Sequence, residues 1–373
     1  MQMFNPTRLK IARQRRGLTK IALGRLVDLT SRSLADFESG RSKPSAETLE
    51  VIADRLKFPI QFFCKPDAEI PATGSVSFRS LKSTSAAQRS SAVAAGAIAF
   101  ELSDWIESEF DLPNPDVPAD LNQLSPGDAA LALRNRWGVG VRPIGNMIHL
   151  LEAKGIRVFS LAERNRQMDA YSLWWRNTPF VFLNTMKTAE HGRMDAAHEL
   201  AHLVLHRHGA FGTGDVEKDA NAFAAAFLMP EASVRSVVNR LIAPTIEQLA
   251  SLKQNWRVSV AALARRLHEL ELVTDWAYRG VCIELSKRGR TKEPQPIERE
   301  TSQVLSKVFG SLRESGVTKS SVASRLGLYT EDLDALTFGL SIGEAATGTS
   351  KQDSTADERR RKLRLAPKGP IAT

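Results

Sequence analysis

Residues 195–208, "DAAHELAHLVLHRH", place four histidines and a glutamate in a stretch made mostly of Ala, Leu and Val. This composition predicts a buried helix, in which an imidazole or carboxylate without a partner is costly. His198 and His202 are four residues apart, so both imidazoles lie on one helix face and can reach one ion. The stretch therefore predicts a buried helix that holds a metal ion.

Glu199 points about 100° away from His198 around such a helix. Its carboxylate therefore does not crowd the ion, yet it can accept a proton from a water molecule held there. Two histidines that bind zinc, with a glutamate between them as general base, are typical of metallopeptidases. The alternative is a helix whose histidines are satisfied by hydrogen bonds within the core.

A catalytic zinc site needs a third protein ligand and one open position. Downstream, "DVEKDANAFAAAFLMP" (215–230) predicts a second helix with an apolar side that runs from Ala220 to Leu228. Glu217 stacks a carboxylate above that packed face, so we expect it to be the third ligand. Asp219 remains the alternative, although it faces away from the apolar stripe.

Two other polar residues near the motif have less specific roles. His206 lies two turns beyond His198, where it either orients a ligand or ends the helix. Tyr171 lies in a segment that we interpret as an edge strand, and packing is a more common role for such a tyrosine than catalysis.

The remaining organisation follows from apolar periodicity and breaks. Helices are expected at 91–109, at 143–154 (entered through Pro143), from 188 to about 285 and from 300 to 340. Strands are expected at 156–161, 170–175 and 179–184. A domain boundary is expected near 70–85, and the proline-rich residues 111–128 predict an extended linker.

The chain has 373 residues, a net charge of +9 and an isoelectric point near 9.7. The charge is concentrated at residues 1–66, which hold 13 Lys and Arg against 6 Asp and Glu, and in the tail from 351. This distribution indicates a polyanionic partner for the first segment. Cys64 and Cys282 are far apart in the sequence, which argues against a disulfide framework or a cysteine-ligated zinc.

No apolar run approaches the roughly 20 residues needed to span a bilayer, which argues against a membrane protein. The start, "MQMFNPTRLK", shows no apolar signal segment. We therefore expect a cytoplasmic protein.

The basic first segment predicts short helices that share a small core. Thr19 and Thr30 are suitable N-cap residues on either side of a short break, which is the geometry of a helix-turn-helix. The expected contacts with double-stranded DNA are Ser31, Arg32 and Ser33 with base edges, and Lys20 and Arg41 with phosphates. The alternative is a helical bundle with a solvated basic face. Residues 316–339 have a similar rhythm and predict a second helix-turn-helix or a protein-contact element.

"RMDAAHELAHLVLH" followed by "EKDANAFAAAFLMP" resembles the ImmA/IrrE metallopeptidases. The resemblance implies that His198, His202 and Glu217 bind Zn²⁺ and that Glu199 is catalytic. Ala201 replaces the Gly that is usual in that family. The segments "LKIAR", "TK" and "ESG" in the first 66 residues resemble Xre/Cro-type repressors, with Lys20, Gly24 and Asp28 departing from the usual pattern.

The fold class we expect is mainly α with an α+β zincin-like domain. The expected domains are an all-helical helix-turn-helix domain (1–66), a linker and helix (67–130), a small-sheet metallopeptidase domain (131–285), a helical C-terminal region (286–340) and a disordered basic tail (341–373).

The sequence therefore predicts a DNA-binding regulator with a zinc-dependent endopeptidase. Its expected substrate is a protein such as a transcriptional repressor, and a homodimer would suit paired DNA half-sites. The alternative is a transcription factor whose zinc domain is a structural or ligand-sensing module without proteolysis. A further alternative is a toxin–antitoxin component that acts through partner contacts.

Overall fold

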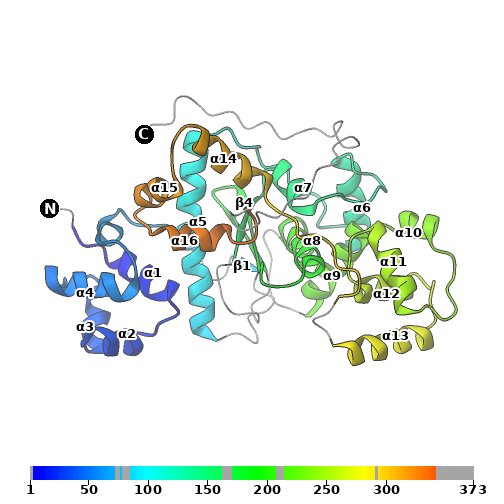
Figure 1. Cartoon of the computed structure of the whole chain (residues 1–373), viewed down its shortest axis with the longest axis horizontal. Helices are drawn as coiled ribbons and strands as arrows, with labels where there is room; N and C mark the ends of the chain where they lie inside the picture. Colours follow the sequence, from blue (N-terminus) through cyan, green and yellow to red (C-terminus); the bar gives the residue numbers. More distant parts are fainter. Residues whose placement is uncertain are drawn as a thin grey trace.

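The computed structural model describes residues 3–71, 76–77, 85–161, 170–206, 214–289 and 293–341 (Figure 1). Within these residues the chain is mainly helical with one small sheet, so the expected fold class is confirmed. The tail expected at 341–373 lies outside the described residues after Ser341. None of the described helices is long and apolar enough to cross a membrane.

The N-terminal head, blue in Figure 1, consists of short helices around a small core. Its helices are α1 (Pro6–Arg15), α2 (Lys20–Val27), α3 (Ser31–Glu38), α4 (Ala46–Leu56) and a 3-10 helix (Ile60–Cys64). Thr19 and Thr30 cap α2 and α3 through their side-chain oxygens, as the sequence predicts. The fully buried residues of this core include Leu9, Leu23, Leu34, Ile52, Leu56, Phe62 and Phe63.

The sheet has four strands in the order β1-β3-β4-β2. They are β1 (Val76–Ser77), β2 (Arg157–Ser160), β3 (Tyr171–Trp175) and β4 (Thr178–Leu183). β3 and β4 form an antiparallel hairpin whose two turn residues, Arg176 and Asn177, have positive φ angles of 45° and 65°. This conformation suits the twist of a two-residue hairpin turn. β2 pairs with β4 in parallel.

The sequence pattern does not predict β1, which lies within the expected domain boundary at 70–85. A two-residue strand is too short to show alternation, and it is defined by its antiparallel pairing with β3. Because β3 lies between β1 and β4, the prediction that Tyr171 lies on an edge strand is wrong. The residues on either side of β1, at 72–75 and 78–84, lie outside the described residues.

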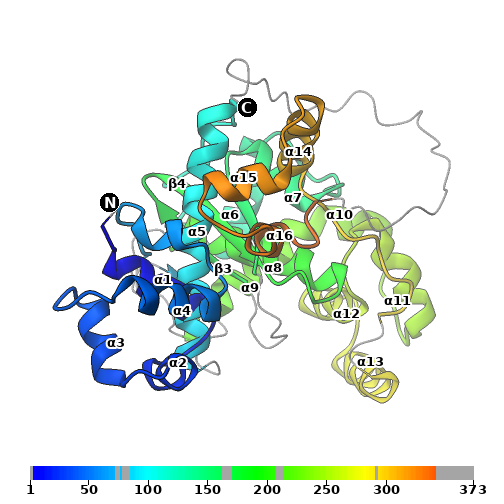
Figure 2. The same ribbon diagram turned by 60° about the vertical axis from the view of Figure 1, so that its left-hand side comes forward.

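Two long helices cover the sheet from opposite faces. α5 (Ala86–Glu109) begins five residues earlier than expected, because Ser85 and Gln88 form a capping box. Tyr171 donates a hydrogen bond to the Ala92 carbonyl of α5 at 2.9 Å, whereas Ser172 contacts α8 (Ala189–Leu205) on the other face. Figures 1 and 2 show α5 running between the head and the sheet.

The other helices surround this centre. They are α6 (Pro126–Arg136), α7 (Met147–Ala153), α9 (Gly214–Leu228), α10 (Glu231–Val237), α11 (Ile246–Leu252), a 3-10 helix (Lys253–Asn255), α12 (Val260–Glu269), α13 (Asp275–Arg288), α14 (Gln303–Glu314), α15 (Lys319–Arg325) and α16 (Thr330–Thr337). α7 does not begin at Pro143 as expected, because the Asn146 side chain caps a helix that starts at Met147.

The last three helices contact both the head and the middle of the molecule (Figure 2). Asp332 of α16 accepts two hydrogen bonds from Arg16, at 2.6 and 2.8 Å. At the start of α14, the first of these three helices, the Glu152 carboxylate of α7 accepts hydrogen bonds from Gln303 N–H and Val304 N–H. The segment expected to be a second helix-turn-helix or a protein-contact element therefore makes contacts within the chain.

Candidate metal centre and nucleic-acid interface

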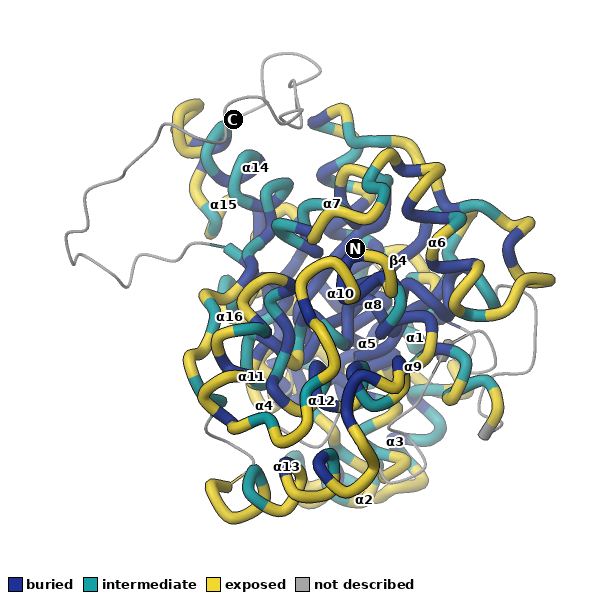
Figure 3. The backbone as a smooth tube through the Cα atoms, turned by 90° about the vertical axis from the view of Figure 1, so that its right-hand side faces the viewer, coloured by how far each residue is buried: buried dark blue, intermediate teal, exposed yellow. Residues whose placement is uncertain are grey.

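α8 carries the His198–His202 pair through the interior of the molecule, where Figure 3 shows the chain as buried. His198, Glu199 and His202 are only 1–2% exposed. The Thr188 side chain caps the first turn, and the helix ends at Leu205. Because the helix is continuous between these points, the two imidazoles keep their positions on one face.

Three possible ligand atoms converge between α8 and α9. His198 Nε2 lies 3.0 Å from His202 Nε2 and 3.4 Å from Glu217 Oε2. His202 Nε2 lies 3.7 Å from Glu217 Oε1. Two ligand atoms on a tetrahedral zinc ion are about 3.3 Å apart, so these spacings fit one ion. Among the described residues, this is the one group of three or more His, Cys, Asp or Glu side chains with such spacing.

The position of Glu217 follows from the packing of α9. The apolar side of this helix, predicted from its sequence, is fully buried at Ala220, Phe223, Ala224, Phe227 and Leu228. Glu217 lies one turn earlier, and its carboxylate reaches the imidazole pair. Asp219, the alternative ligand, is not part of this group, although its charge acts on His206.

Glu199 is held by a residue that the sequence pattern alone does not single out. Ser172 Oγ, on β3, donates a hydrogen bond to Glu199 Oε2 at 2.7 Å. Strand alternation was the available signal, because it places Ser172 on the face opposite Tyr171 and Leu173. The sequence did not show which helix covers that face.

His206 lies beside the pair. Its Nδ1 atom is 3.1 Å from Nδ1 of His202, on the ring edge opposite Nε2, which leaves His202 Nε2 turned toward Glu217. Burial lowers the pKa of His206, and the carboxylates of Asp219 and Glu217 oppose this shift. The contact suits a residue that orients a ligand, one of the two roles expected from the sequence.

Buried ion pairs anchor the first half of α8. Arg193, which is 2% exposed, pairs with Glu300. Burial lowers the pKa of Arg193, and the Glu300 carboxylate opposes the shift. Glu190 pairs with Lys253 at 2.8 Å, and both side chains are fully buried. These pairs tie α8 to the segment before α14 and to the end of α11.

The first turn of α3 presents part of the expected DNA-binding set. Ser31 and Arg32 are exposed there. Ser33 is half-buried, and its hydroxyl lies 2.9 Å from the Thr30 hydroxyl at the cap of the helix. The structure therefore leaves Ser31 and Arg32 accessible to a base edge, while Ser33 also takes part in the cap.

The two expected phosphate contacts lie near the other end of α3. Lys20 Nζ is 3.8 Å from the Glu38 carboxylate, and its side chain is 42% exposed. Arg41 pairs with Asp36 at 2.7 Å, and its side chain is 70% exposed. Both cations remain accessible to solvent and are only partly neutralised.

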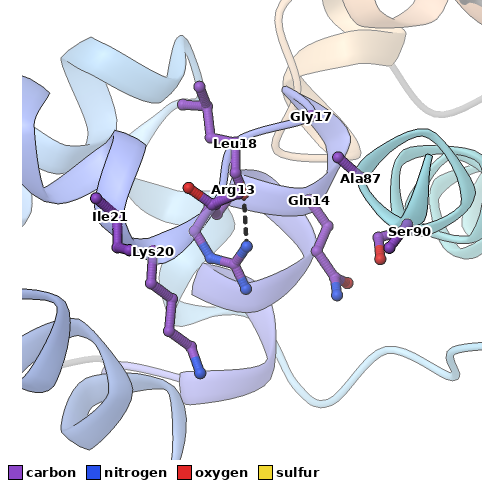
Figure 4. A pocket seen from close by; sticks show the side chains of 10 residues that line it. Arg13, Gln14, Gly17, Leu18, Lys20, Ile21, Ala87 and Ser90 are labelled. Atoms are coloured by element: carbon purple, nitrogen blue, oxygen red, sulfur yellow. Dashed lines mark hydrogen bonds between the residues drawn. The ribbon is translucent and has the colours of Figure 1, made fainter.

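A shallow pocket of about 410 Å³ separates the head from the start of α5. Figure 4 shows Arg13, Gln14 and Lys20 of the head extending toward one side of it, with Ala87 and Ser90 of α5 across the gap. Arg13 also donates a hydrogen bond to the Leu18 carbonyl. The pocket marks where the head meets the body of the molecule.

Comparison with protein families gives two matches. Residues 151–268 match the IrrE N-terminal-like domain of the M78 peptidase family, which points to a metallopeptidase-like module. Residues 9–63 match a helix-turn-helix family, which indicates DNA binding. No curated protein matches the chain. The first match contains all four residues of the candidate metal centre, and the second contains α2 and α3.

Proposed function

We propose, from the premise that this chain joins a helix-turn-helix domain to an IrrE N-terminal-like peptidase domain, that it is a DNA-binding regulator with zinc-dependent endopeptidase activity. Its substrate is another protein, such as a transcriptional repressor. The observation that carries this proposal is the convergence of His198, His202 and Glu217 next to buried Glu199.

The ligand atoms suit zinc. Two imidazole nitrogens and one carboxylate oxygen form a common catalytic zinc set that leaves a fourth position open. When bound, zinc supplies a Lewis acid that polarises the scissile carbonyl and makes water more acidic. The protein holds these three ligands on two helices that pack together through a fully buried face, so their positions are fixed before substrate binds.

Glu199 is the general base in this proposal. Its carboxylate accepts a proton from the attacking water and returns it to the leaving amine. Glu199 is 1% exposed, and its carboxylate accepts a hydrogen bond from Ser172, so it is held within the apolar environment of α8. In a site closed to bulk water, such a fixed charge acts more strongly than it does in solvent.

The sheet offers a surface for an extended substrate. Main-chain hydrogen bonds hold a peptide that adds to a sheet edge as a further strand. Both edges of β3 are occupied, and β1 and β2 are the outer strands among the described residues. Since β1 pairs with the strand that contacts Glu199, we place the substrate on the β1 side.

The head directs this activity to DNA. In our proposal, α3 enters the major groove with Ser31 and Arg32 at base edges, and Lys20 and Arg41 hold phosphates. A homodimer would match two half-sites, and the cytoplasm would supply both the DNA and the repressor substrate.

The test is to incubate the zinc-loaded chain with repressor proteins encoded beside its gene and to identify cleavage products by mass spectrometry. Glu199→Gln should bind zinc normally and cleave nothing, because it keeps the ligands and removes the base. A matched control is His268→Gln, since His268 pairs with Asp275 and is not part of the converging group.

Cleavage by Glu199→Gln at the wild-type rate would exclude the mechanism. Zinc binding and DNA binding without proteolysis under any condition would instead favour the alternative, a transcription factor whose metal domain is structural or ligand-sensing.

A further inference from the structure

Ser172 is a buried hydroxyl on the strand that faces the motif helix. The residue is 2% exposed, and its Oγ lies 2.7 Å from Glu199 Oε2 and 3.3 Å from the Glu199 carbonyl oxygen. The two residues are 27 positions apart in sequence, and the contact joins β3 to α8.

The face of β3 that covers α8 is buried at Ser172. Tyr171 and Leu173, the residues on either side of Ser172, point to the other face of the sheet and are buried there. Ser172 itself pairs across the sheet with Val181 of β4. A buried hydroxyl destabilises a core unless it is hydrogen-bonded. Here its partner is a carboxylate, and a charge-assisted hydrogen bond is roughly twice as strong as a neutral one.

We propose that Ser172 is a positioning residue that fixes the carboxylate of Glu199 for proton transfer. It holds Oε2 toward β3 and so sets the rotation of the carboxylate relative to the face that carries His198 and His202. This inference rests on the proposed peptidase function. A side chain that orients the base contributes to turnover without contacting the substrate.

Two substitutions separate the hydroxyl from the shape of the side chain. Val and Thr have nearly the same shape, but only Thr keeps a hydroxyl. With a protein substrate, we expect Ser172→Val to lower kcat by about 10- to 100-fold with KM nearly unchanged, and Ser172→Thr to restore most of it. Zinc content should be equal in all variants, because Ser172 contacts none of the three ligands in the described contacts.

Ser160→Ala is the matched control. Ser160 is also a fully buried serine in the same sheet, but its hydroxyl lies 2.8 Å from the Thr185 hydroxyl and not beside Glu199. It should leave kcat unchanged. If branched residues at 172 prevent folding, Ser172→Ala removes the hydroxyl with a smaller change in shape.

Crystal structures of the metal-free variants give a readout that needs no activity. We expect the Glu199 carboxylate to turn away from its wild-type position in Ser172→Val and Ser172→Ala, and to keep that position in Ser172→Thr. If none of the proteins, wild type included, cleaves a substrate, the proposed function fails but this comparison still decides the role of Ser172. A Glu199 carboxylate that stays in place without the hydroxyl, or wild-type kcat in Ser172→Val, would overturn the inference.

Discussion

At the residue scale, the choice between Glu217 and Asp219 as the third ligand can be tested directly. Glu217→Gln should weaken zinc binding by more than about 100-fold, since removing even an outer partner of a ligand costs about 10- to 100-fold. Asp219→Asn should change the affinity by less than about 10-fold, because Asp219 lies outside the converging group. Competition titration with a zinc chelator measures both constants, and a larger loss in Asp219→Asn would contradict the assignment.

The residues of the candidate site differ in how far the sequence could predict them. His198 and His202 come together through helical periodicity, which is local, so the five residues from His198 to His202 suffice. Glu217 required a second inference, the apolar side of α9. Ser172 was missed because its contact with Glu199 depends on how β3 packs on α8, and no local pattern specifies that packing.

At the element scale, the start of α14 depends on a carboxylate from another helix. Glu152 of α7 accepts hydrogen bonds from Gln303 N–H and Val304 N–H, and also from the Ser302 hydroxyl. Burial raises the pKa of Glu152 from 4.5 to about 7, although these hydrogen bonds oppose the shift. Between these two pH values the folded chain binds more protons than the unfolded chain, so the free energy of unfolding falls as pH rises.

We expect this pH dependence to disappear in Glu152→Gln. The measured quantity is the free energy of unfolding of the wild type minus that of the variant. Between about pH 4.5 and about pH 7 this difference should fall by at most about 3 kcal/mol. Urea unfolding at a series of pH values measures it. Using the difference cancels the contribution of His149, whose pKa burial lowers. A difference that rises with pH would contradict a raised pKa of Glu152.

Helix α3, which we propose to enter the major groove, gives a second prediction at this scale. Arg32→Ala should lower affinity for the specific operator by about 1–3 kcal/mol and relax its sequence preference. Lys20→Ala should weaken binding to all sequences alike. It should also reduce the slope of log affinity against log salt concentration by about one. Fluorescence anisotropy at several salt concentrations separates these effects. Lys57→Ala, at the end of α4 and outside the residues that we propose to contact DNA, is the control that should change neither.

Periodicity predicted the longer elements and missed the shortest. β2 and β3 lie within their expected segments, and β4 begins one residue before its own. Thr19 and Thr30 cap the helices that were expected after them. β1 has only two residues, so its existence depends on pairing with β3 and not on its own sequence. The start of α7 was placed too early because the cap is Asn146, and Pro143 stands outside the helix.

At the scale of the whole molecule, the structure shows a head that is docked on the body. Ser91 of α5 donates a hydrogen bond to the Arg15 carbonyl at the end of α1. Lys65, just after the head, donates one to the Leu326 carbonyl before α16. The sequence predicted a boundary near these residues but could not predict the docking, because the contacts join segments more than 70 residues apart.

The Arg16–Asp332 pair tests this docking. Arg16 also donates to the Leu56 carbonyl, so one guanidinium joins α1, the end of α4 and α16. Asp332→Asn leaves Arg16 without its charged partner, and should lower the free energy of unfolding by about 1–3 kcal/mol. This is less than for a fully buried pair, because the Arg16 side chain is 27% exposed.

Thermal unfolding and limited proteolysis of the linked head and body measure the effect, and protease should release the head faster from Asp332→Asn. Asp334→Asn on the same helix is the matched control. Asp334 is 51% exposed and pairs with Lys319, so its loss should change the free energy by less than about 1 kcal/mol. Equal proteolysis of the two variants would mean that the Arg16–Asp332 pair does not hold the head on the body.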